Sequence, residues 1–161
     1  MRGLIIFLAT GGYTGYFPFA PGTVGSLVGV GIYVFLWFLL GEVPPRRIFP
    51  VSVYLLSLLA LFFLTSWLAA EAERIFEQKD CRKIVIDEIV GYLVTMSFLP
   101  PRVEYVILGF ICFRFFDILK PYPVGAFERK LGGGYAVVAD DVMAGIYANI
   151  VLQVLLLFEL F

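Results

Sequence analysis

Long apolar runs separated by short polar segments occupy most of the chain. Residues 24–40 are almost wholly apolar, and residues 48–70 carry no charged side chain. A bilayer core is crossed by an apolar helix of about 17 to 25 residues. Both runs therefore predict transmembrane helices, whereas the apolar run at residues 4–9 is too short to span.

The middle of the chain combines charge with apolar character. Residues 71–83 are charged and predict a helix. Residues 84–99 are apolar apart from Asp87 and Glu88 and end at a Pro-Pro pair, which predicts a third membrane helix that is short or tilted.

Two more helices are expected in the C-terminal half. Residues 103–119 predict a fourth helix, which the prolines at 121 and 123 stop because proline cannot continue the backbone hydrogen bonds. After glycines 132–134, a fifth helix is expected from about residue 140 to 161. The pattern predicts an all-α integral membrane bundle of about four to five transmembrane helices, formed by a single domain over residues 1–161.

Composition supports a membrane protein and excludes nucleic acid as a partner. The chain is 61% hydrophobic and has a mean hydropathy of +0.93, far above a typical soluble domain. Its net charge of −1 gives no basis for binding a phosphate backbone. Cys81 and Cys112 fit no disulfide or metal-binding spacing and are expected to be reduced packing residues.

Charge also predicts the orientation in the membrane. Five spans place the termini on opposite faces, and the face with the N-terminus carries eight of the twelve basic residues: Arg2, Arg74, Lys79, Arg82, Lys83, Lys120, Arg129 and Lys130. The positive-inside rule makes that face cytoplasmic. Ten of the thirteen acids fall on or near the same face, so the acids converge on one mouth of the bundle.

The candidate site consists of acids that three helices bring to that mouth. Ionisable groups at membrane depth are costly and are kept where they pair, meet water or hold an ion. Crowded carboxylates are most simply neutralised by a hard divalent cation, and Mg²⁺ suits carboxylates that share it with water and phosphate. The candidate ligands are Asp80, Asp87, Glu88, Asp117, Asp140 and Asp141.

Each of these signals also has a structural interpretation. Arg114 and Asp117 form an i,i+3 pair that makes a charged span tolerable. Asp140 and Asp141 suit a helix N-terminus, where acids complement the macrodipole.

Asp80 lies seven residues before Asp87 and would share its helical face if one helix covers both.

Glycines mark two further features. Gly91 and Gly145 each follow a carboxylate by four residues, which suits either helix packing or access of a ligand to the backbone. The glycine-rich stretch from residue 10 to 26 opens a helix, so its N–H groups and the hydroxyls of Thr23 and Ser26 could hold a phosphate. A simple N-cap by Thr23 explains the same stretch.

Missing residue types narrow the chemistry. Without any histidine, a Ser-His-Asp triad, a phosphohistidine and a histidine-ligated zinc site are excluded. Neither cysteine precedes an arginine by six positions, and no P-loop pattern occurs. Hydrolysis would then use metal-assisted attack by water or an aspartate nucleophile.

Five blocks, taken together and in order, resemble the phosphatidylglycerophosphatase A family from about residue 10 to 150. The blocks are Ala20-Pro21-Gly22-Thr23-Val24-Gly25-Ser26, Lys79-Asp80, Ile86-Asp87-Glu88-Ile89-Val90-Gly91, Phe113-Arg114-Phe115-Phe116-Asp117-Ile118-Leu119-Lys120-Pro121 and Asp140-Asp141-Val142-Met143-Ala144-Gly145. The chain departs from the family at Cys81, where the family usually has proline, and in its glycine pattern at 132–134.

The resemblance implies a Mg²⁺-dependent enzyme that converts phosphatidylglycerophosphate to phosphatidylglycerol and inorganic phosphate at the bacterial cytoplasmic membrane. It implies metal binding and catalysis by the six acids, with Asp87, Glu88, Asp117, Asp140 and Asp141 as the catalytic set. It also places Arg114 and Lys120 near the phosphate.

Three alternatives to a phosphatase stay open. A cation channel or transporter also carries acids inside a bundle, but distributes them through the membrane depth. A structural subunit would use its charges to bind a partner. A phosphotransferase that joins alcohols to lipid headgroups uses clustered aspartates, but its aspartate spacing does not occur here.

Overall fold

A computed structural model describes residues 1–40, 51–122 and 134–158 of the chain. Within these residues every regular element is helical, which confirms the predicted all-α class. The elements are α1 (Arg2–Ala9), the 3-10 helix η1 (Thr14–Tyr16), α2 (Pro21–Leu40), α3 (Val51–Phe76), α4 (Ile86–Thr95), α5 (Val103–Leu119) and α7 (Gly134–Leu157).

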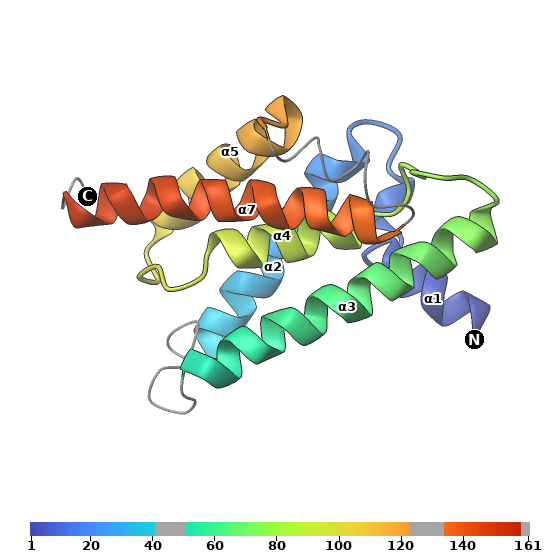
Figure 1. The fold of residues 1–161 in the computed structure, drawn as a ribbon, viewed down its shortest axis with the longest axis horizontal. Helices are drawn as coiled ribbons and strands as arrows, with labels where there is room; N and C mark the ends of the chain where they lie inside the picture. The colour runs from blue at the N-terminus through green and yellow to red at the C-terminus, as the bar shows by residue number, and fades with distance from the viewer. Residues whose placement is uncertain (41–50, 123–133, 159–161) are drawn as a thin grey trace.

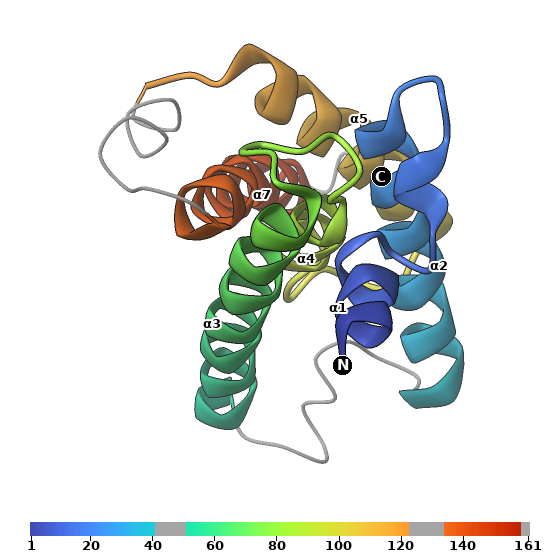
Figure 2. The same ribbon diagram turned by 90° about the vertical axis from the view of Figure 1, so that its right-hand side faces the viewer.

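The bundle is built around α4. Figures 1 and 2 show α4 in the middle, with α2, α3, α5 and α7 around it, and its most extensive interface is with α7. The two helices run in the same direction. In Figure 1 the N-terminus and the C-terminal end of α7 lie at opposite ends of the long axis.

In the part of the chain that the structure describes, three helices are long and apolar enough to cross a membrane: α2, α3 and α7. Most of the large side chains along their outer faces are exposed, such as Phe35 and Phe38 on α2 and Leu56 and Phe63 on α3. A soluble bundle would bury these faces, so their exposure indicates contact with lipid. The chain is therefore a helical membrane protein.

Helix α4 is shorter than the expected segment 84–99. Its ten residues extend about 15 Å, half of the hydrocarbon thickness, so it ends inside the bundle. Side chains of α7 satisfy the freed carbonyls: Asn149 Nδ2 donates to Thr95 O at 2.8 Å and to Ser97 O at 2.7 Å. Gln153 Nε2 adds a bond of 3.3 Å to Ser97 O. A helix end at this depth needs such partners because no water replaces them.

The contact between α4 and α7 requires two glycines. A Cβ on Gly145 would lie 2.3 Å from the carbonyl oxygen of Gly91, and a Cβ on Gly91 would lie 2.7 Å from Asp141 O. The backbones thus touch one turn beyond Asp87 and Asp141. This close parallel crossing brings the two aspartates together.

The charged segment 71–83 is helical only in part. Helix α3 runs through it to Phe76, after which Glu77 and Asp80 adopt positive φ angles of 55° and 50°. Left-handed residues end an α-helix, so residues 77–85 form a loop. No single helix covers Asp80 and Asp87, so the condition for a shared helical face is not met.

Helix α7 begins at Gly134 and not near residue 140. A Cβ on Gly134 would lie 2.6 Å from Ser66 O, so the missing side chain lets α7 start directly against α3. Asp140 and Asp141 consequently lie in the second turn of the helix and not at its N-terminus. Glycines 132 and 133 and residues 41–50 lie outside the described residues.

Candidate active site

Three carboxylates meet where α4 begins. Oxygen atoms of Asp87, Glu88 and Asp141 all lie within 4.8 Å of one another. Asp87 is 5% exposed and Asp141 6%. The first turn of α4 supplies two of the acids and α7 the third, so the parallel glycine crossing sets the geometry of the cluster.

The cluster fits a divalent cation. Within the described residues, one oxygen of each acid is buried without a hydrogen-bond partner: Asp87 Oδ1, Glu88 Oε2 and Asp141 Oδ2. Such an oxygen costs about 1–3 kcal/mol, and more when charged. Hard cations bind oxygens at about 2.0–2.6 Å, so ligands of one ion lie within roughly 5 Å of each other. Both the spacing and the unsatisfied oxygens match this requirement.

The electrostatics at the start of α4 also favour a bound cation. Burial raises the pKa of Asp87, and the nearby Asp117 carboxylate adds a small effect in the same direction. Burial, followed by the charge of Asp87, raises the pKa of Glu88 well above its usual range. Together these effects disfavour full ionisation of the cluster unless a positive charge is present.

Helix α5 contributes an ion pair beside the cluster. Arg114 Nη1 lies 2.5 Å from Asp117 Oδ2, and both side chains are largely buried. The same Nη1 donates a long bond of 3.4 Å to Ser26 Oγ. Ser26 is fully buried and itself donates to Gly22 O at 2.9 Å. Arg114 is thus held from α2 and from its own helix.

The remaining predicted residues surround this centre. Lys120, the C-cap of α5, forms an ion pair with the buried Asp140. Asp80 is exposed in the loop after α3, outside the three-acid cluster, and its N–H donates to Glu73 Oε1 at 2.7 Å. Thr23 is half-buried in the first turn of α2. Metal binding by Asp80 and phosphate binding by Thr23 stay predictions.

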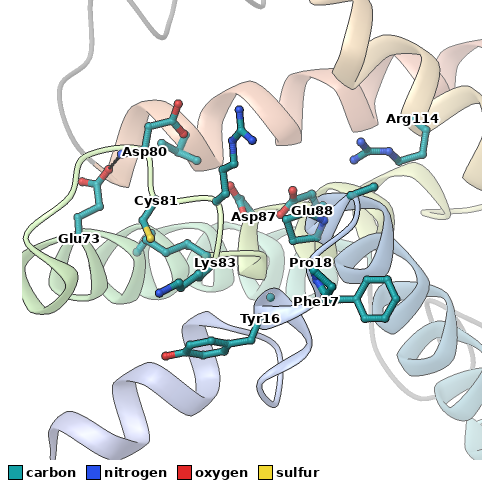
Figure 3. Close-up of a pocket in the computed structure, with 18 residues that line it drawn as sticks. Tyr16, Phe17, Pro18, Glu73, Asp80, Cys81, Lys83, Asp87, Glu88 and Arg114 are labelled. Carbon is teal, nitrogen blue, oxygen red and sulfur yellow. Dashed lines mark hydrogen bonds between the residues drawn. The ribbon is translucent and has the colours of Figure 1, made fainter.

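A pocket of about 580 Å³ opens onto the acids (Figure 3). Its walls come from η1 and the residues that follow it, the start of α2, the end of α3, the 77–85 loop, α4 and α5. They include Gly15, Tyr16, Phe17, Pro18, Pro21, Gly22, Glu73, Asp80, Cys81, Arg82, Lys83, Asp87, Glu88 and Arg114. Asp80 and Arg114 thus share a pocket with Asp87 and Glu88.

The glycine-rich entry to α2 approaches the acids closely. A Cβ on Gly22 would lie 2.3 Å from Glu88 Oε1 and 3.4 Å from Arg114 Nη1. Pro21 occupies the first position of α2, where its missing N–H costs nothing. Gly22 therefore lets the positive end of α2 face the pocket.

Sequence reasoning missed several residues of the pocket. Arg82, Lys83 and Glu73 were assigned only to a charged segment, and Tyr16 to a glycine-rich loop. Their positions depend on how η1 packs against the 77–85 loop, which neither hydropathy nor spacing reveals. The sequence offers one indication of their role, which is that the cation pair Arg82-Lys83 lies five residues before the acid pair Asp87-Glu88.

Comparisons with known proteins agree on one family. A model of the phosphatidylglycerophosphatase A family matches residues 7–156. A phosphatidylglycerophosphatase A of Haemophilus influenzae is 37% identical and covers 91% of this chain and 85% of its own. The Escherichia coli phosphatidylglycerophosphatase A is 31% identical and covers 86% and 76%.

A third relative bears a different name. A Bacteroides thetaiotaomicron protein, provisionally named a phosphatidylinositol-3-phosphatase, is 35% identical over 94% of this chain and 92% of its own. No solved structure matches the chain. With a family model that covers nearly its whole length, this chain belongs to the phosphatidylglycerophosphatase A family and is a membrane enzyme of the phosphatase class.

Proposed function

We propose that this protein hydrolyses phosphatidylglycerophosphate to phosphatidylglycerol and inorganic phosphate, with Mg²⁺ as cofactor. The observation that carries the proposal is the cluster of Asp87, Glu88 and Asp141, which holds buried, unsatisfied oxygens and of which Asp87 and Glu88 line a pocket at one end of a membrane bundle. Membership of the family supplies the phospholipid substrate class.

Asp87, Glu88 and Asp141 are the residues that would hold the ion, with Asp117 close by. When bound, Mg²⁺ would neutralise the cluster, bind phosphate oxygens and lower the pKa of water. The proposal keeps Asp140 and Asp80 as possible further ligands, but neither belongs to the three-acid cluster.

The protein's own groups would position the phosphate. Arg114 is fixed by Asp117 and Ser26 and offers its guanidinium to the pocket, where it can offset charge on the phosphate oxygens. Lys120 holds Asp140 and thereby ties the end of α5 to α7. A carboxylate that is not bound to metal would accept the proton of the attacking water.

The location of the pocket suits a lipid substrate. The acyl chains can stay in the bilayer while the headgroup enters the pocket at the helix ends, so the lipid need not be extracted. By the positive-inside rule this end faces the cytoplasm, and bacterial relatives suggest the inner membrane.

The transport alternative predicts acids along the whole membrane depth. Within the described ranges, the buried carboxylates instead gather at one end of α4 and α7. The opposite end of α4 is filled by neutral groups such as Asn149 and Gln153. This arrangement favours a catalytic site at one end of the bundle over a path that conducts ions across the membrane.

The test is phosphate release by the purified protein in detergent, with Mg²⁺ and then with a chelator, beside the Asp141→Asn variant. Magnesium-dependent release from phosphatidylglycerophosphate that is lost in the variant is expected. Phosphatidylinositol 3-phosphate with the same acyl chains belongs in the assay because of the Bacteroides relative. Faster release from that lipid, or no release with any metal, would overturn the proposal.

A further inference from the structure

We propose that Arg82 and Lys83 form a second anion subsite, which binds the phosphodiester of the lipid headgroup while the carboxylate cluster holds the terminal phosphate. The inference rests on the proposed function and deepens it, because it says which residues select a headgroup with two phosphates. Neither residue is part of the carboxylate cluster or of the Arg114 ion pair.

Among the residues that the structure describes, Arg82 and Lys83 have no acidic partner, unlike Arg114 and Lys120. Arg114 is paired with Asp117, and Lys120 with Asp140. Over the ranges 1–40, 51–122 and 134–158, no carboxylate forms an ion pair with Arg82 or Lys83. Both are exposed and line the same pocket as the acids, so their charges are open to an incoming anion.

Lys83 is held in place before any ligand binds. Its Nζ lies 5.1 Å from the ring centre of Tyr16 and 5.4 Å from that of Phe76, which restrains the ammonium group between two aromatic faces. A cation ordered in this way loses less entropy when an anion arrives than a free lysine does.

The backbone that carries Lys83 is also fixed. A Cβ on Gly15 would lie 1.9 Å from Lys83 O, so η1 packs directly on the loop. The N–H of Val85 donates to Ala9 O at 2.9 Å, which ties the same loop to α1. The N-terminal segment therefore acts as a support for the proposed subsite.

The arrangement gives the headgroup a direction. Figure 3 shows Arg114 beyond Glu88 and Lys83 on the other side of the acid pair, next to Tyr16. A lipid with its terminal phosphate at the acids would therefore place its phosphodiester along Lys83, on the side of the acid pair away from Arg114.

The size of the pocket supports a headgroup that extends from the acids to Lys83. About 580 Å³ is the scale of a site for a whole small ligand, and a single phosphate occupies only a small part of it. The room beyond the acids is bordered by Arg82, Lys83, Tyr16 and Pro18. Two cations and two apolar walls match a phosphodiester joined to glycerol.

The experiment measures product inhibition of phosphatidylglycerophosphate hydrolysis in detergent micelles. Phosphatidylglycerol carries only the phosphodiester, and inorganic phosphate mimics only the terminal group. In Lys83→Gln and Arg82→Gln, the inhibition constant for phosphatidylglycerol is expected to rise about tenfold, the usual cost of a lost charge-assisted contact. The inhibition constant for inorganic phosphate should stay within twofold of the wild-type value.

Lys79→Gln is the matched control, because Lys79 is an exposed lysine of the same loop that does not line the pocket. It should leave both constants unchanged, and all variants should keep the wild-type circular dichroism spectrum. Unchanged phosphatidylglycerol inhibition in both pocket variants, or an equal rise for inorganic phosphate, would overturn the subsite alone. Failure of the wild-type protein to hydrolyse the lipid would overturn the proposed function as well.

Discussion

The two ends of α4 differ in whether their buried polar groups have hydrogen-bond partners. At the C-terminal end, Asn149 and Gln153 of α7 donate to the carbonyls of Thr95 and Ser97. At the N-terminal end, three acids each keep a buried oxygen that no donor among the described residues reaches. One helix is thus anchored at one end and left electrostatically unsatisfied at the other.

The difference separates stability from function. A buried hydrogen-bonded end contributes to stability, because removing a partner leaves a polar group unpaired. A buried cluster of like charges lowers stability and is kept when it binds something. Substitutions at the two ends should therefore move activity and stability independently.

The largest effect on activity is expected at the acidic end. Asp87→Asn should lower phosphate release by at least about a thousandfold, because a metal ligand or base is lost. The same change should leave the thermal unfolding temperature in chelator equal or higher, since a buried charge is removed. A parallel activity assay and unfolding scan check both parts, and activity within tenfold of wild type would contradict the account.

The second-largest effect is expected at the glycine contact between α4 and α7, which lies between the two ends of α4. Gly145→Ala places a Cβ 2.3 Å from the Gly91 carbonyl, so α4 and α7 must separate. We expect a loss of about 1–3 kcal/mol in unfolding free energy together with a strong loss of activity, because Asp87 and Asp141 move apart. Gly31→Ala is the control, since nothing lies within 4 Å of its Cβ position. Equal stability of the two variants would show that the close crossing does not constrain the fold.

Removing the Asn149 side chain should mainly lower the stability of the protein. Asn149→Ala removes the side-chain donor to Thr95 O and leaves Ser97 O with only the longer bond from Gln153, which should cost about 1–3 kcal/mol. Activity at a temperature well below unfolding should fall by less than tenfold, because the acids stay in place. Denaturation in detergent measures the first effect, and a loss of activity as large as that of Asp87→Asn would break the comparison.

The smallest effect is expected at Ser26. Its bond to Arg114 is long, 3.4 Å, and the ion pair with Asp117 also holds the guanidinium. Ser26→Ala should therefore reduce kcat/KM by no more than about fivefold, the equivalent of a weak hydrogen bond. A larger loss would indicate that the Ser26 hydroxyl binds the phosphate directly, the role that the glycine-rich entry to α2 allows.

Much of the fold could be predicted from hydropathy, because a bilayer demands long apolar helices. The length of α4 could not: residues 84–99 are apolar throughout apart from two acids, and the helix ends at Thr95 where α7 supplies the capping amides. The loop after Phe76 also escaped prediction, since the left-handed geometry of Glu77 and Asp80 has no clear signature in the sequence.

The acids of the site could be predicted from the sequence more readily than the other residues that line the pocket. Acids inside apolar helices are conspicuous, so Asp87, Glu88 and Asp141 could be named before their positions were known. Arg82 and Lys83 lie in a charged loop where cations are common, and only the packing of η1 brings them to the pocket. Which of the acids meet depended on the glycine crossing, a tertiary feature.

The most direct test of the central claim is calorimetric titration of Mg²⁺ into the purified, substrate-free protein, beside Asp141→Asn and Asn149→Ala. We predict saturable binding by wild type, retained binding by Asn149→Ala, and at least about tenfold weaker binding by Asp141→Asn. Equal binding by wild type and Asp141→Asn would contradict the assignment of the carboxylate cluster as the metal site.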